Sequence, residues 1–126
     1  GCFIQHGYQG DSYGGENLYA QWTSNPSSGP PPPEHVMTRW WDSEVNLGFG
    51  NGNGHFTQAA WRDTEYAGCG TATKSFQYRQ WTLYCHISVC RYVKPGNCNV
   101  APHTWWNNML ADYSPCGPEC PNEGCF

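Results

Sequence analysis

The stretch QWTLYCHISV (residues 80–89) decides the fold, because apolar and polar side chains alternate along it. A period of two is typical of a strand that is buried mainly on one side. The predicted buried face carries Trp81, Leu83, Cys85, Ile87 and Val89, and the predicted exposed face carries Thr82, Tyr84, His86 and Ser88. We therefore expect one long strand here, with His86 on its solvent side.

The segments before this strand predict a second strand and two helices. The glycine-punctuated stretch YAGCGTAT (66–73) is typical of the start of a strand, and FTQAAW (56–61) fits a helix. EHVMTRWWDSEV (34–45) predicts another helix, since Val36 and Trp40 are four residues apart and share a face. Helices mixed with strands of antiparallel type predict an α+β domain.

Glu44 lies at the edge of the apolar face of that helix, three residues after Trp41. A carboxylate at this position points toward the interior; the alternative is a surface glutamate at the helix end. Before the helix, TSNPSSGPPPP (23–33) predicts a loop, because consecutive prolines favour extended polyproline II.

The segments after the long strand predict a turn, a helix and an extension. KPGNCN (94–99) is a turn, and TWWNNMLADY (104–113) has helical spacing with Thr104 as its cap. The tail CGPECPNEGCF (116–126) is rich in cysteine. We predict a folded domain over residues 1–100 and a cysteine-rich C-terminal extension over 101–126.

Composition places the chain among secreted proteins. Its 126 residues suit one domain, and its eight cysteines are even in number with no Cys-x-x-Cys pair, which predicts four disulfide bridges.

Six lysines and arginines without a cluster argue against a nucleic-acid partner. No apolar run approaches the roughly 18 residues of a membrane span. The chain begins at Gly1 without a leader, so we expect a processed product.

Five short motifs resemble those of the CAP superfamily, which comprises cysteine-rich secretory proteins, antigen-five venom proteins and plant pathogenesis-related proteins. GHFTQAAW (54–61) and VCRYVKPGN (89–97) resemble its two signatures. YGGENLYA (13–20), CFIQH (2–6) and WWDSE (40–44) resemble its Gly-Glu-Asn-Leu, Cys-x-x-x-His and Trp-aromatic-x-Glu elements. The five occur in the order that the family has.

The chain departs from the family pattern in three ways. The family's first helix, with a His-Asn-x-x-Arg element, should precede Cys2 and is missing; Lys94 stands where the family's turn has a proline; and Lys74 lies where many members have a cysteine. Without the first helix, apolar surface would be uncovered. We expect either a second chain that supplies this helix or a cover formed by the helix around 105–113.

The resemblance implies an α-β-α sandwich with a central antiparallel sheet and a broad cleft, within a disulfide-rich α+β domain. It places the family's two histidines and two glutamates at His6, Glu16, Glu44 and His55. Such donors suit zinc, with the carboxylates either as ligands or as groups that orient the imidazoles. A metal-free hydrogen-bond network is the alternative.

The resemblance also implies a disulfide between Cys2 and Cys69. Cys85 and Cys98 look like additions to the family pattern, and Cys90 is expected to pair with one of them.

The function that the resemblance implies is a secreted, extracellular module that binds a lipid or sterol in defence, venom or reproduction, with membrane contact but no transmembrane segment. The aromatic content motivates a carbohydrate or cell-wall binder as an alternative. A zinc-dependent hydrolase with Glu16 or Glu44 as base is another, but no His-Glu-x-x-His or Gly-x-Ser-x-Gly motif is present. We expect the other histidines, His35, His86 and His103, to have no special role.

Overall fold

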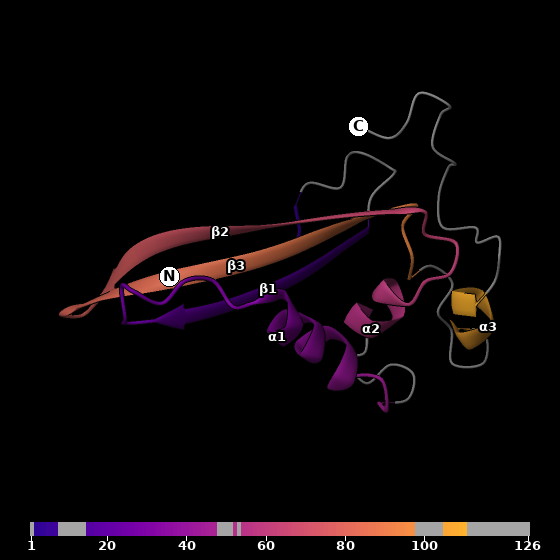
Figure 1. Cartoon of the computed structure of the whole chain (residues 1–126), viewed down its shortest axis with the longest axis horizontal. Helices are drawn as coiled ribbons and strands as arrows, with labels where there is room; N and C mark the ends of the chain where they lie inside the picture. The colour runs from indigo at the N-terminus through magenta and orange to yellow at the C-terminus, as the bar shows by residue number, and fades with distance from the viewer. Residues whose placement is uncertain (1, 8–14, 48–51, 53, 98–104, 111–126) are drawn as a thin grey trace, which may run out of the picture.

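The structure of the chain is a computed structural model. It is built on a three-stranded antiparallel sheet (Figure 1). The structure describes residues 2–7, 15–47, 52, 54–97 and 105–110. The strands are β1 (Gly15–Thr23), β2 (Tyr66–Tyr78) and β3 (Trp81–Val93), in the order β1-β3-β2. The predicted disulfide-rich α+β class with a central antiparallel sheet is confirmed.

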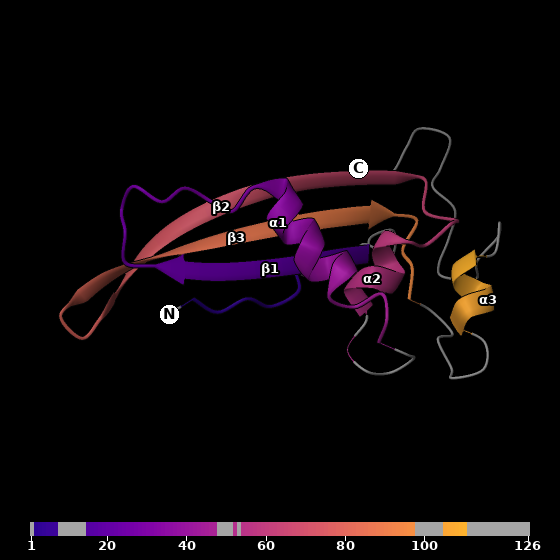
Figure 2. The same cartoon turned by 60° about the horizontal axis from the view of Figure 1, so that its bottom comes forward.

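Helical segments lie against one face of this sheet (Figures 1 and 2). They are α1 (Pro33–Met37), which continues as the π-helix η1 (Thr38–Asp42), and α2 (Gly54–Ala59). Pro33 suits the first helical position because its φ is already fixed near the helical value. Val36 and Trp40 are buried, as their predicted shared face requires, and pack with Cys90 and Tyr92 of β3.

β3 pairs with β1 along one edge and with β2 along the other, and the burial of its side chains corrects the prediction for its two faces. His86 is only 2% exposed and Ser88 only 6%, although both were predicted on the solvent side. The alternation is present, but the more buried face is the one that carries His86 and Ser88, because this face is turned toward α1 and η1. Ile87 and Val89, which were predicted buried, are only half-buried. Trp81, predicted buried, is 57% exposed because the β2–β3 hairpin extends beyond the last β1–β3 pair, Thr23 with Tyr84.

The two disulfides among the described residues differ from the predicted pairing. Cys2 bonds to Cys85, and Cys69 bonds to Cys90. Cys69 and Cys90 are direct partners in the β2–β3 register, so the cross-strand pair is already adjacent. Cys85 is an odd number of residues from Cys90 and therefore points to the opposite face of the sheet. The predicted bond between Cys2 and Cys69 and the predicted partners of Cys90 are thus wrong.

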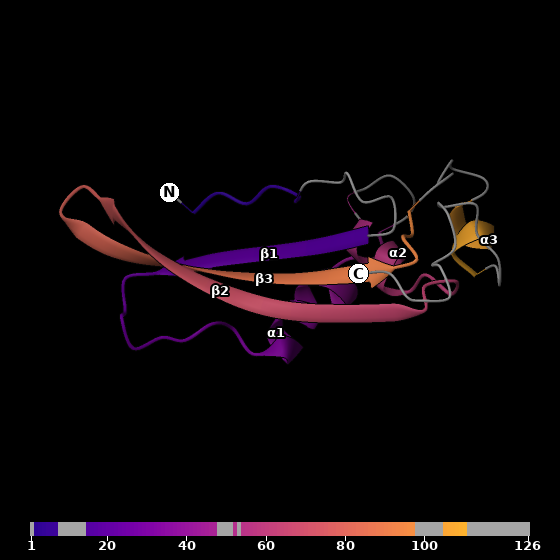
Figure 3. The same ribbon diagram turned by 90° about the horizontal axis from the view of Figure 1, so that it is seen from above.

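The chain segment 2–7 runs beside β1 (Figure 3). The Cys2 sulfur lies 3.8 Å from the carbonyl oxygen of Gln21, and His6 lies against Glu16, so the segment is antiparallel to β1. The Cys2–Cys85 bond ties this segment to the central strand. Cys98, Cys116, Cys120 and Cys125 lie outside the described residues, so the prediction of four bridges stays open for them.

The short helix α3 (Trp105–Leu110) lies beyond α2, at the end of the sheet (Figures 1 and 2). Its Met109 is buried with Phe56 and Trp61, and the Met109 carbonyl accepts the Arg62 N–H at 2.9 Å. β2 is exposed along its length except at Phe76, so the described part of this helix does not cover that strand.

Three expectations about the ends of the chain stay predictions. They are the second chain that supplies the missing helix, the domain boundary near residue 100 and the Thr104 cap, which lies outside the described residues. None of the described helices is long and apolar enough to cross a membrane.

Candidate functional site

Glu44 and His55 form the first of two matching pairs. Glu44 follows η1 and is 7% exposed, which confirms that its carboxylate points inward. One carboxylate oxygen lies 2.6 Å from Nδ1 of His55, and the other accepts the Phe56 N–H at 2.8 Å. Because the carboxylate holds both the ring and the following N–H, the imidazole has a fixed orientation at the start of α2. Its side chain remains 40% exposed.

Glu16 and His6 repeat the arrangement at the start of β1. One oxygen of Glu16 lies 3.0 Å from Nδ1 of His6 and accepts the Gly7 N–H at 2.9 Å. The Glu16 side chain is 8% exposed and that of His6 is 57% exposed. In both pairs, therefore, a buried carboxylate binds a partly exposed histidine together with the N–H of the next residue.

This arrangement decides which ring nitrogen is available for chemistry. An ionised carboxylate is an acceptor only, so Nδ1 carries the proton and Nε2 of each neutral ring is left as an acceptor. Carboxylates that orient metal-binding histidines act in this way. Within the described residues, however, no three histidine, cysteine, aspartate or glutamate side chains gather in a group that could hold a metal. The structure joins His6 to Glu16 and His55 to Glu44 as two separate hydrogen-bonded pairs.

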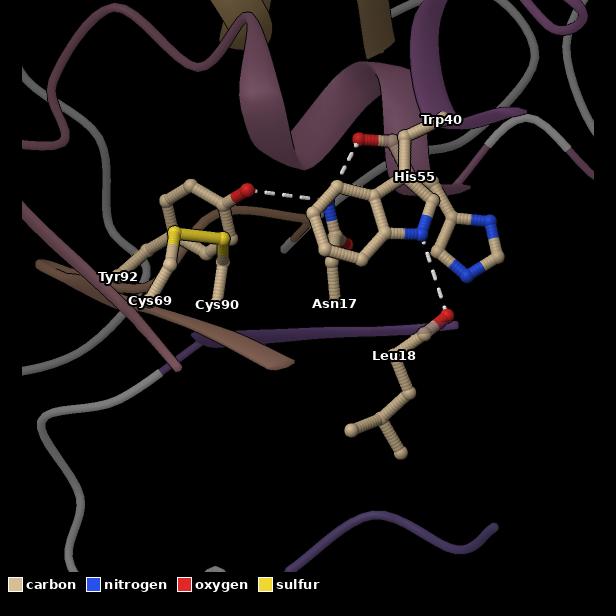
Figure 4. Close-up of a disulfide and its surroundings, with 7 residues drawn as sticks. All are labelled: Asn17, Leu18, Trp40, His55, Cys69, Cys90 and Tyr92. Atoms are coloured by element: carbon tan, nitrogen blue, oxygen red, sulfur yellow. Dashed lines mark hydrogen bonds between the residues drawn. A yellow bond between two sulfur atoms is a disulfide. The ribbon is translucent and has the colours of Figure 1, made fainter. Parts of the chain in front are cut away.

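Asn17 holds the backbone at His55 in place (Figure 4). Its Nδ2 donates to the His55 carbonyl at 3.0 Å and to the Tyr92 hydroxyl at 3.2 Å. Asn17 is 2% exposed and sequence reasoning missed it, although it follows Glu16 in the Gly-Glu-Asn-Leu motif. Burial raises the pKa of the Tyr92 phenol, and the hydrogen bond from Asn17 opposes part of that rise. The neutral hydroxyl can thus keep accepting from Asn17.

Trp40 completes the support of His55 (Figure 4). The two rings are stacked, with centroids 6.1 Å apart and an interplanar angle of 15°. The indole Nε1–H donates to the Leu18 carbonyl at 3.1 Å, which links η1 to β1. The orientation of His55 therefore depends on η1, β1 and β3 together.

Side-chain hydrogen bonds also fasten α2 to the end of β3. The Gln58 side-chain oxygen accepts the Gly96 N–H at 2.9 Å, and the Thr57 hydroxyl donates to the Asn97 side-chain oxygen at 2.6 Å. A β-carbon at Gly96 would lie 2.7 Å from the Trp61 ring, so only glycine allows this close approach.

A groove of about 600 Å³ lies between α1 and the sheet, separate from the two histidine–glutamate pairs. None of its lining residues carries a charge. They are Pro30, Pro31, Pro32, Pro33, Val36, Met37, Trp40, Cys69, Gly70, Thr71, Ser88, Val89 and Cys90. Sequence reasoning predicted the proline run as a loop but had no signal that it would form the wall of a groove.

The remaining histidines differ in their surroundings. His35 is exposed, and its Nε2 lies 3.1 Å from the Tyr19 hydroxyl. His86 is buried in β3, with Nδ1 2.8 Å from the Thr73 hydroxyl. His103 lies outside the described residues.

Comparison with known proteins places these features in a family. The model of the cysteine-rich secretory protein family, CAP, matches residues 2–92, which include all four predicted site residues. The chain is similar to salivary antigen-5 of Dipetalogaster maximus, at 38% identity over 66 residues, which are 48% of this chain and 25% of that protein. It is also similar to venom allergen 5 of Polistes dominula, at 33% identity over 70 residues, which are 48% of this chain and 29% of that protein.

A fungal relative shows that the similarity is not confined to insects. The protein named Repressed by EFG1 protein 1 of Candida albicans is 40% identical over 52 residues, which are 41% of this chain and 17% of that protein. The matched part of this chain thus spans less than a third of each of these relatives. Since the family model covers most of the chain, from the Cys2 disulfide through β3, the chain belongs to the cysteine-rich secretory protein (CAP) family.

Proposed function

We propose that this chain is a secreted CAP-type binding protein whose groove beside α1 takes a lipid or sterol. The groove carries the proposal: its volume of about 600 Å³ suits a small ligand, and its lining is uncharged and largely apolar. Disulfide Cys69–Cys90 lies in the groove wall and keeps β2 and β3 joined there. A wall held in this way lowers the cost of ordering on binding. Similarity to a salivary antigen and to a venom allergen supports secretion and a role in saliva or venom.

A charge placed at the rim of the groove tests this proposal. Met37 lines the groove and is 41% exposed, so Met37→Arg should fold normally and should weaken binding of tritiated cholesterol or oleic acid about tenfold or more. Val45 is also 41% exposed but does not line the groove, so Val45→Arg is the matched control and should bind normally.

Three results of that measurement would contradict the proposal. Equal binding by the two variants would place the ligand elsewhere, and loss of binding on addition of a chelator would make the lipid site depend on metal. Saturable binding of soluble β-glucan without binding of cholesterol or oleic acid would favour the carbohydrate alternative, for which Trp22 and Trp81, 62% and 57% exposed, provide candidate rings.

We further propose that zinc binds through Nε2 of His6 and His55. The observation in favour is that a buried carboxylate orients each ring by its Nδ1. Because no larger donor group gathers among the described residues, zinc would complete its coordination with water or would draw the two pairs together. Glu16 and Glu44 are already engaged by an imidazole and a backbone N–H, which favours binding over hydrolysis.

Calorimetry with zinc tests this second proposal. His55→Ala should abolish the zinc signal, and Glu44→Gln should weaken it about 10–100-fold, because the carboxylate that orients the ring is lost. His35→Ala removes an exposed histidine outside the two pairs and should bind zinc as the unmodified protein does. Unchanged zinc affinity in His55→Ala would show that the site lies elsewhere.

A further inference from the structure

The floor of the groove contains a buried hydroxyl without a hydrogen-bond partner. Ser88 lies in β3, lines the groove and is 6% exposed. Within the described part of the chain, its Oγ has no partner, and neither has Nε2 of His86, which is 2% exposed. Burying a polar group without a partner costs about 1–3 kcal/mol. Two such groups therefore call for an explanation.

The two groups belong to one face of β3. Ser88 and His86 are two residues apart, so their side chains point to the same side of the sheet. Of the two, Ser88 lines the groove. In the strand register, Ser88 lies opposite Thr71 of β2, another residue that lines the groove. The wall above this floor includes Pro30–Pro33, and proline has no backbone N–H to donate. The hydrogen-bonding capacity on the floor is thus left for a ligand.

The charge of the groove decides what kind of ligand head fits. No lining residue is basic, so an ionised carboxylate bound there would be buried without a counter-charge, which is costly. A neutral hydroxyl both donates and accepts, as does the hydroxyl of Ser88. An alcohol head therefore satisfies the floor, and a fatty acid head does not.

We propose that the groove selects an apolar ligand with a single hydroxyl, of the sterol-alcohol type, and that Ser88 Oγ, beside His86, is the hydrogen-bonding anchor for that hydroxyl. This rests on the proposed function, since the apolar body of the ligand fills the same groove. The inference goes beyond the proposed function in two respects. It predicts that the groove prefers an alcohol to a carboxylic acid, and it assigns Ser88 as the residue responsible for that preference.

Two ligands that differ only in the hydroxyl test the proposal. Cholesterol and 5-cholestene share their ring system and tail, but 5-cholestene lacks the hydroxyl. In competition with tritiated cholesterol, the unmodified protein should prefer cholesterol about tenfold, since a site built to bond a hydroxyl rejects the analogue without it. Oleate should compete more weakly than oleyl alcohol, because its carboxylate would be buried without a counter-charge.

Removal of the anchor should erase the preference. Ser88→Ala should bind cholesterol about tenfold more weakly and 5-cholestene unchanged, so that the two become equal. The free energy of unfolding of this variant should be unchanged or slightly larger, because an unpaired buried hydroxyl has been removed. Thr82→Ala, in the same strand but outside the groove, is the control and should keep the preference.

The outcomes separate this inference from the function on which it rests. If the unmodified protein binds cholesterol and 5-cholestene equally, or if Ser88→Ala keeps the preference, the anchor is wrong while lipid binding stands. If neither ligand binds, the proposed function fails. If Ser88→Ala is less stable and the unmodified protein shows no preference between the two ligands, the hydroxyl holds a trapped water, and the anchor is overturned.

Discussion

Replacing Cys2 and Cys85 together by alanine is expected to lower the free energy of unfolding by about 4 kcal/mol. The bond joins residues separated by 83 positions, so its loss releases a long loop in the unfolded chain, and the chain-entropy model assigns a cost of this size to such a loop. Cys85 is 1% exposed, so alanine is the better replacement because serine would bury a hydroxyl. Urea unfolding of both proteins measures the difference.

The loss should also be visible locally. Without the bond, segment 2–7 is held to β1 chiefly by the contacts of His6 and Gly7 with Glu16. The Gly7 N–H should therefore exchange with solvent faster in the variant. The double variant Cys69→Ala/Cys90→Ala is the control. This disulfide joins residues only 21 positions apart, so its removal should lower the free energy of unfolding by less, about 3 kcal/mol. The Gly7 N–H should stay protected from exchange in this variant. Equal stability of the Cys2/Cys85 variant and the unmodified protein would contradict the expected role of the bond.

Local elements could be predicted because their signals lie within a few residues. The spacing of Val36 and Trp40 predicted the helix that contains α1 and η1, and the alternation around Leu83 predicted β3. The same helical face indicated an inward position for Glu44, with a surface glutamate as the alternative, and the structure shows it buried. Each of these statements needs only the periodicity of one element.

Features that depend on how the elements pack could not be predicted in this way. Alternation assigns the side chains of β3 to two faces, but it does not reveal which face is turned toward α1 and η1, so the burial of His86 was missed. Disulfide partners depend on which side of the sheet each cysteine occupies, and the family resemblance was misleading for Cys2. The groove forms between residues distant in sequence, from Pro30 to Cys90, so no local pattern indicates it.

Trp40→Ala is expected to be the other most destabilising change, with a loss of about 3–5 kcal/mol in the free energy of unfolding. The ring is 2% exposed and packs with Val36, Cys90 and Tyr92, so its removal leaves a cavity between η1 and the sheet. The hydrogen bond from Nε1 to the Leu18 carbonyl is lost as well. Trp40→Phe keeps an apolar ring but not the donor, so its loss should be smaller than that of Trp40→Ala. Urea unfolding followed by circular dichroism gives the three values.

The neighbouring tryptophan is a matched control for this effect. Trp41 follows Trp40 in η1, is 37% exposed, and contacts Phe56 edge-on with ring centroids 4.9 Å apart. Trp41→Ala removes the same number of atoms from the same helix, yet it leaves no enclosed cavity, so the expected loss is about 1 kcal/mol. Equal losses at the two positions would mean that Trp40 does not fill the interior as described. Because His55 stacks on Trp40 and not on Trp41, weaker zinc binding should accompany Trp40→Ala alone.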